Sequence, residues 1–157
     1  MSFIVALNAL LCYTKLKSLQ TRGGEMMTQK EAVYFWIEKS RDELESARIM
    51  FDAGRYLYTG FMCHQAIEKA LKAYYVFVHD KRQPHEHNLD KLINLVKLSD
   101  ELDDDKRQTL TKLKPLYIKT RYEDEKNRTA EVLTDSYCKK LLAETEVLLE
   151  WILQLMK

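Results

Sequence analysis

Arg121 and Tyr122 stand next to each other in a strongly polar stretch and are the first candidates for a binding site. A guanidinium group forms forked hydrogen bonds with phosphate, and an aromatic ring stacks on a nucleic-acid base. Lys119 precedes them and adds a second cation, so this segment can contact a nucleotide or an RNA strand. The opposing interpretation is a solvated surface loop in which Arg121 pairs with the acidic residues that follow it.

His64 and Glu68 lie four residues apart in a strongly helical segment, so their side chains meet on one helix face. A buried pair of this kind can line a ligand groove, with Glu68 holding the His64 ring in one tautomer. It can equally be a polar pair that fixes helix packing, which is the interpretation we favour. Lys69 and Lys72 fall on the outer side of the same helix and are expected to be solvated, unless a binding groove runs there.

His79, His85 and His87 lie in or beside one short segment. The His85-x-His87 spacing binds a metal ion only when a third ligand converges on it, so the zinc signature is weak. We therefore predict no metal site and no cofactor, and interpret His87 as a helix-start residue that hydrogen-bonds across the loop. The sequence also contains no glycine-rich phosphate loop, no nucleophile elbow and no paired carboxylates at a known catalytic spacing.

Most of the chain has the residue pattern of amphipathic helices. Thr28-x-x-Glu31 has the form of a capping box, and apolar residues follow at alternating steps of four and three up to Phe51. Gly54 suits the left-handed position that ends a helix, so a second helix over residues 56–79 should form a tight hairpin with the first. This second helix carries two adjacent apolar stripes, which predicts either the central helix or a dimer helix.

Three further helices are expected. They begin near Asn88, at the aspartates of residues 103–105 and near Thr134. Pro115 should bend or break the second of them, and residues 120–129 are predicted to form a polar loop. Short connections between long helices predict an all-α protein, an up-and-down antiparallel bundle of four main helices plus a shorter one.

The overall composition excludes several classes of protein. A length of 157 residues suits one domain with one core, and a formal net charge of +1 gives no general attraction to nucleic acid or membrane. Cys12, Cys63 and Cys138 include no C-x-x-C pair and are expected to be buried, reduced thiols of a cytoplasmic protein. The apolar run at residues 3–11 is too short for a membrane helix and lacks the features of a signal peptide.

Residues 1–26 form a doubtful N-terminal extension. Residues 22–25, Arg-Gly-Gly-Glu, directly precede two methionines, and their codons can spell a purine-rich bacterial ribosome-binding sequence. We therefore hypothesise that translation starts at Met27 or Met26 and that the domain comprises residues 27–157. The alternative is a genuine additional helix that ends at the two glycines.

Several short motifs occur in an order that resembles the HEPN domain of bacteria and archaea. They are Ala47, Gly54-Arg55-Tyr56, the run from Gln65 to Ala73 (Gln-Ala-x-Glu-Lys-Ala-Leu-Lys-Ala), His87-Asn88-Leu89-x-x-Leu92, and Thr120-Arg121-Tyr122. Each motif alone is weak because its residues are common helix formers, whereas the shared order and spacing are specific. The resemblance covers residues 29–156.

The resemblance implies a helical bundle that dimerises and is often encoded beside a minimal nucleotidyltransferase as a toxin-antitoxin-like pair. Active members resemble metal-independent ribonucleases with an Arg-x(4–6)-His motif, in which Arg121 would be the arginine. The histidine would fall where this chain has Lys126, Asn127 and Arg128. The chain also lacks the His-x-Tyr ending of members that the nucleotidyltransferase modifies.

These observations predict a dimeric nucleotide- or RNA-binding module without an intact ribonuclease motif. The expected ligand-binding residues are Lys119, Arg121, Tyr122, His64, Glu68, Lys69, Lys72 and His87. One alternative is a metal-independent ribonuclease toxin in which His64 or His87 serves as the base, and another is a non-catalytic interaction scaffold. We expect no enzyme activity unless a different base replaces the missing histidine.

Overall fold

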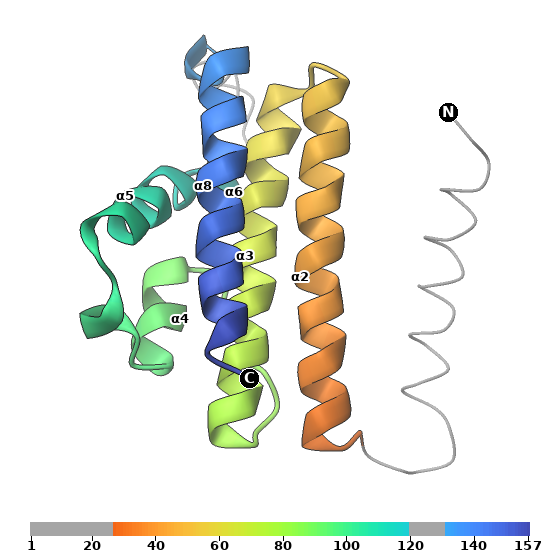
Figure 1. Cartoon of the computed structure of the whole chain (residues 1–157), viewed down its shortest axis with the longest axis vertical. Coiled ribbons are helices and arrows are strands. Elements are labelled where there is room, and N and C mark those ends of the chain that lie inside the picture. Colours follow the sequence, from red (N-terminus) through yellow and green to blue (C-terminus); the bar gives the residue numbers. More distant parts are fainter. Residues whose placement is uncertain (1–26, 120–130) are drawn as a thin grey trace, which may run out of the picture.

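The computed structural model describes residues 27–119 and 131–157, and the regular structure within these ranges is helical. The long helices α2 (Gln29–Asp52), α3 (Tyr56–His79) and α8 (Asp135–Gln154) run side by side (Figure 1). Shorter elements pack beside them, namely α4 (Leu89–Leu95), the 3₁₀ helix η1 (Ser99–Glu101), α5 (Asp104–Leu113) and α6 (Leu116–Lys119). The predicted all-α bundle is confirmed. None of the helices in the described part of the chain combines the length and apolar character that crossing a bilayer requires.

The α2–α3 hairpin has the ends that the sequence predicts. The Thr28 hydroxyl accepts a hydrogen bond from the Glu31 backbone N–H at 3.3 Å, and the Thr28 N–H donates to Glu31 Oε2 at 2.9 Å. Gly54 adopts a φ of +67°, and the Arg55 N–H donates to the Met50 carbonyl at 2.8 Å, which closes the end of α2. α3 starts at Tyr56, directly after this turn. Because the connection is so short, α2 and α3 lie antiparallel (Figure 1).

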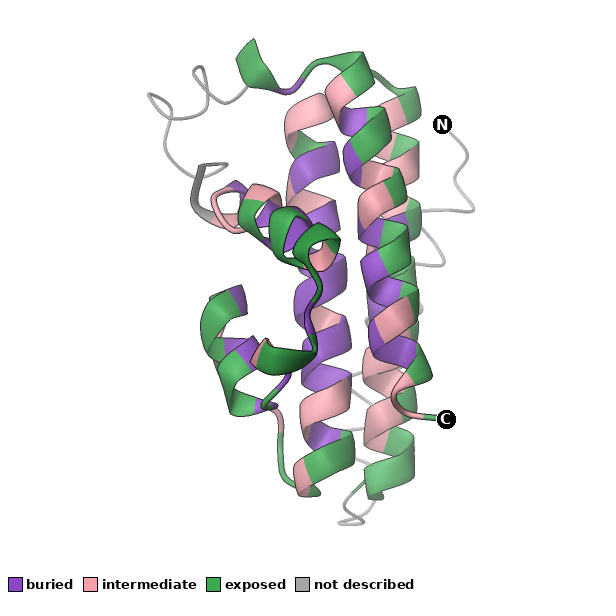
Figure 2. Ribbon diagram, turned by 60° about the vertical axis from the view of Figure 1, so that its left-hand side comes forward, coloured by how far each residue is buried: buried purple, intermediate pink, exposed green. Residues whose placement is uncertain are grey.

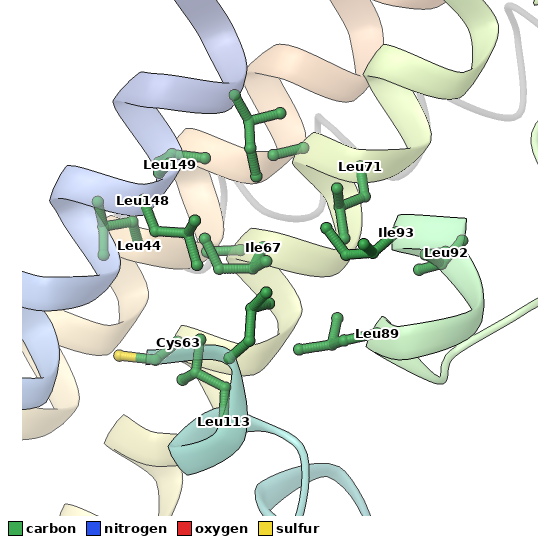
Figure 3. Close-up of a cluster of buried hydrophobic side chains, with 14 of the residues drawn as sticks. Leu44, Cys63, Ile67, Leu71, Leu89, Leu92, Ile93, Leu113, Leu148 and Leu149 are labelled. Atoms are coloured by element: carbon green, nitrogen blue, oxygen red, sulfur yellow. The ribbon is translucent and has the colours of Figure 1, made fainter. Parts of the chain in front are cut away.

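α3 is the central helix of the molecule. It contacts α2 and α8 and also the short helices α4, α5 and α6. Buried residues occur along most of its length (Figure 2). Figure 3 shows Ile67 and Leu71 of α3 in one cluster with Leu149 of α8, Leu89 of α4 and Leu113 of α5. The two apolar stripes of α3 are therefore used largely for packing within this chain.

The segment between α3 and α8 is divided into shorter helices than the sequence pattern suggests. Asn88 caps α4, Asp103 caps α5 and Thr134 caps α8, so the predicted starts of these helices are confirmed. Pro115 lies in the turn between α5 and α6 and breaks the helix as predicted. α8 then runs in the same direction as α3 and antiparallel to α2 (Figure 1).

Gly60 allows α6 to approach α3 closely. A Cβ atom on Gly60 would lie 3.0 Å from Leu116 Cδ1 and 3.5 Å from Leu133 Cδ1. Glycine within a helix costs about 1 kcal/mol relative to alanine, so a packing reason is needed for its place in α3. Leu116 and Leu133 are both buried and fill the space that the missing side chain leaves.

The cysteines that the structure describes are buried thiols, as predicted. Cys63 and Cys138 are both free. Burial raises the pKa of Cys63 to about 12 and that of Cys138 to about 11, so both remain protonated and unreactive near neutral pH. Cys12 and the hypothesised N-terminal extension, residues 1–26, lie outside the described ranges.

Candidate functional site

Glu68 is the centre of a polar cluster on α3. Its side chain is fully buried, and Oε1 accepts hydrogen bonds from Lys72 Nζ at 2.8 Å, His87 Nδ1 at 3.1 Å and Lys69 Nζ at 3.3 Å. Burial alone would raise the pKa of Glu68, but Lys69 and Lys72, followed by His87, outweigh burial and hold this pKa below its usual value. Glu68 is therefore an ionised carboxylate that balances the cations around it.

Lys69 and Lys72 are held against the body of the protein. The Lys72 side chain is only 5% exposed and that of Lys69 is 18% exposed. Their ammonium groups lie 5.9 Å (Lys69) and 5.7 Å (Lys72) from the ring centroid of Trp36 on α2. The expectation that both lysines are solvated is therefore wrong. Their ammonium groups bond to Glu68 and pack near the ring of Trp36, which keeps both side chains largely out of water.

His64 is buried beside Glu68, but another element orients its ring. His64 Nδ1 donates a hydrogen bond to the Leu113 carbonyl at the end of α5, at 3.1 Å. His64 Nε2 lies 3.8 Å from Glu68 Oε2, beyond hydrogen-bond range, and neither atom has a hydrogen-bond partner in the described ranges. Burial lowers the pKa of His64. The Leu113 carbonyl, rather than Glu68, thus selects the tautomer.

Tyr117 of α6 stacks on two histidines of this cluster. Its ring centroid lies 5.3 Å from that of His64 and 5.2 Å from that of His87, with interplanar angles of 24° and 9°. The stack joins α6 to α3 and to the loop before α4. Because Tyr117 precedes Arg121 by four residues, it anchors the chain just ahead of the predicted binding segment.

His87 connects this buried cluster to the surface. It directly precedes Asn88, whose Oδ1 caps α4 by accepting from the Lys91 N–H at 3.1 Å. The bond from Nδ1 to Glu68 crosses the loop between α3 and α4, as predicted, while the next residue, Asn88, starts the helix. Its side chain is 50% exposed. With Nδ1 donating to Glu68, Nε2 is left to accept a hydrogen bond.

The two remaining histidines do not join the cluster. His79 lies at the end of α3, where Nε2 contacts the Leu95 carbonyl at 3.1 Å. His85 is exposed. Within the described residues, no three His, Cys, Asp or Glu side chains gather closely enough to hold a metal ion.

Comparison with known proteins decides the family. The HEPN domain family matches residues 33–155, which is most of the chain. This chain belongs to the HEPN domain family. No curated protein matches the sequence of this HEPN domain.

Two solved structures share the HEPN fold of this chain. TT1696 from Thermus thermophilus has a TM-score of 0.65 and 22% sequence identity, over 78% of this chain and 96% of that protein. ST0689, an archaeal HEPN homologue, has a TM-score of 0.61 and 24% identity, over 80% of this chain and 98% of that protein. At these identities the similarity establishes the fold.

The HEPN domain brings together most of the binding residues predicted from its sequence. His64, Glu68, Lys69, Lys72 and His87 meet on one face of α3. Arg121 and Tyr122 lie outside the described residues, as does the side chain of Lys119.

Sequence reasoning missed two aromatic members of the site, Trp36 and Tyr117. The position of Tyr117 four residues before Arg121 is a signal that could have indicated its role. Trp36 has no comparable signal, because the hairpin alone brings it to the lysines.

Proposed function

We propose that this HEPN domain is a dimeric module that binds RNA or nucleotide, without cutting it, on the face formed by α3, α6 and the start of α4. The observation that carries the proposal is the cluster around Glu68, in which two ammonium groups meet one carboxylate. The two ammonium groups lie in the same cluster as the half-exposed His87, which also bonds to Glu68. Arg121 follows Tyr117 of the same cluster by four residues and would supply a phosphate contact.

The proposed absence of cleavage rests on the residues that follow Arg121 in the sequence. Removing a proton from an RNA 2′-hydroxyl near neutral pH requires a base such as histidine. The chain has Lys126, Asn127 and Arg128 where the family's ribonuclease motif has its histidine. The ammonium group of lysine, the guanidinium group of arginine and the amide of asparagine are all poor acceptors for the proton of the 2′-hydroxyl at that pH.

Dimerisation is proposed because HEPN domains commonly dimerise and because α3 keeps some apolar surface exposed. Tyr58 and Phe77 are each 42% exposed, and Val78 is 48% exposed. Sedimentation at micromolar concentration should therefore show twice the mass of one chain. A monomer across the whole concentration range would exclude a binding groove shared by two copies.

The proposed setting is a cytoplasmic toxin-antitoxin-like pair with a minimal nucleotidyltransferase. This part of the proposal rests on the family resemblance. A nucleotidyltransferase encoded by the neighbouring gene would support it, whereas an isolated gene would favour the interaction scaffold.

The binding proposal is tested with fluorescently labelled single-stranded RNA. The domain should bind weakly and in a salt-dependent way, and Arg121→Ala should lower the affinity about tenfold and reduce the salt slope by about one. Arg41→Ala is the matched control, because Arg41 lies half-exposed on α2 and pairs with Glu38. Equal losses in the two variants would show that Arg121 makes no special contact.

One observation favours metal-independent RNA cleavage as a second candidate function. Glu68 Oε1 accepts a hydrogen bond from His87 Nδ1 at 3.1 Å, an arrangement that orients an imidazole for use as a general base. The same binding samples would be checked for RNA fragments in the presence of EDTA. Cleavage that disappears both in Arg121→Ala and in His64→Ala or His87→Ala would replace the non-catalytic proposal.

A further inference from the structure

Two buried atoms of the polar cluster face each other without a hydrogen bond. His64 Nε2 and Glu68 Oε2 are 3.8 Å apart, and both lack partners among the residues that the structure describes. Because His64 Nδ1 donates to the Leu113 carbonyl, a neutral ring turns the lone pair of Nε2 toward a carboxylate oxygen. Two acceptors that face each other away from water cost free energy, and a proton placed between them removes that cost.

We propose that His64 and Glu68 form a proton-binding pair that takes up one proton as the pH falls below neutrality and thereby strengthens RNA binding on the same face. The proton binds to Nε2, and the new N–H donates to Glu68 Oε2. The ring becomes an imidazolium, the carboxylate stays ionised, and the cluster gains one positive charge. The effect on RNA rests on the proposed function, whereas the proton uptake does not.

The groups around His64 determine the pH at which it takes up the proton. Burial lowers the pKa of His64, while the Leu113 carbonyl and the charge of Glu68 oppose this effect. Proton uptake should therefore occur at a lower pH than in an exposed histidine. Within residues 27–119 and 131–157, the charged and titratable groups that face the pair are Lys69 and Lys72 of α3, Glu43 of α2, His87 before α4 and Tyr117 of α6.

Glu43 is the one acidic side chain in that group. It interacts with Lys69 and with Glu68, and burial raises its pKa. The two ammonium groups resist a further positive charge, whereas Glu68 and Glu43 favour it. The pair therefore stays unprotonated at neutral pH and binds a proton only below the pH at which an exposed histidine does.

The aromatic stack places the new charge close to the surface. Tyr117 lies between α3 and the loop before α4, with its ring centroid 5.3 Å from His64 and 5.2 Å from His87. A phosphate at the exposed side of His87 would thus lie on the order of 10 Å from the imidazolium. One charge at this distance should change the affinity for RNA about three- to tenfold once salt screening is included.

Nitrogen NMR of the histidine rings tests the proton uptake without RNA. As the pH is lowered from about 7.5 to about 5, His64 Nε2 should change from an unprotonated to a protonated nitrogen. In Glu68→Gln this change should move to lower pH, because the variant removes the negative charge beside the ring. A His64 ring that keeps one protonation state throughout, or an unchanged titration in Glu68→Gln, would overturn the proton-binding pair.

A labelled oligouridylate tests the effect on binding. Its affinity for the unsubstituted protein should rise about three- to tenfold over the same pH range, and His64→Gln should lose most of this rise. The matched control is His85→Gln, which changes an exposed histidine outside the cluster and should keep the rise. An equal rise in His64→Gln and in the unsubstituted protein would overturn the link to RNA.

The two measurements separate the two proposals. If the oligouridylate does not bind at any pH, the RNA-binding function and its regulation both fail, while the NMR titration still decides whether the pair binds a proton. The NMR titration of His64 uses the unsubstituted protein. The proton uptake is therefore tested even if His64→Gln does not fold.

Discussion

Glu68→Ala should lower the free energy of unfolding by about 3–5 kcal/mol at neutral pH, the loss typical of a buried ion pair that is deprived of one partner. The Lys72 side chain is 5% exposed and would remain in the protein without its counter-charge. Lys69 and His87 would lose the same acceptor. Urea unfolding followed by circular dichroism measures the loss.

The matched control for this substitution is Glu45→Ala on α2. Glu45 pairs with Arg48 at 3.1 Å, but its side chain is 63% exposed, so its removal should cost less than about 1 kcal/mol. Similar losses at Glu45 and Glu68 would contradict the role assigned to the buried cluster.

The contribution of Glu68 should also depend on pH in a defined direction. The pKa of Glu68 in the folded protein lies below its usual value of 4.5, so the unfolded chain binds more protons in the interval between the two. The stabilisation that Glu68 gains from its pairing with Lys69 and Lys72 is therefore complete above pH 4.5 and is lost as the pH falls through the folded-state pKa. The difference in stability between the unsubstituted protein and Glu68→Ala should shrink accordingly in acid.

Ile67→Ala should cost about 2–5 kcal/mol, because it removes a large side chain from the middle of the core. Ile67 is fully buried on α3, among the residues that α3 shares with α4, α5 and α8 (Figure 3). The control is Ile49→Ala on α2, where the side chain is 51% exposed and the expected loss is below about 1 kcal/mol. If Ile67→Ala lowered the free energy of unfolding by less than about 1 kcal/mol, the neighbouring helices would have moved to fill the space. α3 would then be less firmly packed than its burial indicates.

The helix ends could be predicted from the sequence because each depends on neighbours in the chain. Thr28 and Glu31 form a capping box through residues three apart, and Gly54 ends α2 through its own φ angle. The lengths of α4 and α5 were harder to predict. Their apolar spacing continues past the points where the helices end. α4 ends where Lys97 adopts a φ of +57° and the Leu98 N–H donates to the Ile93 carbonyl, and α5 ends at the turn that contains Pro115.

The polar cluster could be predicted only in part. The spacing of His64 and Glu68 indicated a pair, but the group that orients His64 is the carbonyl of Leu113, 49 residues away. A backbone carbonyl has no signature in the sequence. The burial of Lys72 was missed for a similar reason, because it depends on Trp36 of the neighbouring helix.

Gly60 has a consequence for how the HEPN domain can vary in length. Leu116 and Leu133 both lie against this residue, so two positions 17 residues apart in the chain contact α3 at one place. Insertions between these two leucines would leave the spacing of the core helices unchanged. Doubling the length of such a segment costs only about 0.6 kcal/mol of closure entropy. The contacts that Leu116 and Leu133 make with Gly60 would stay the same at either length.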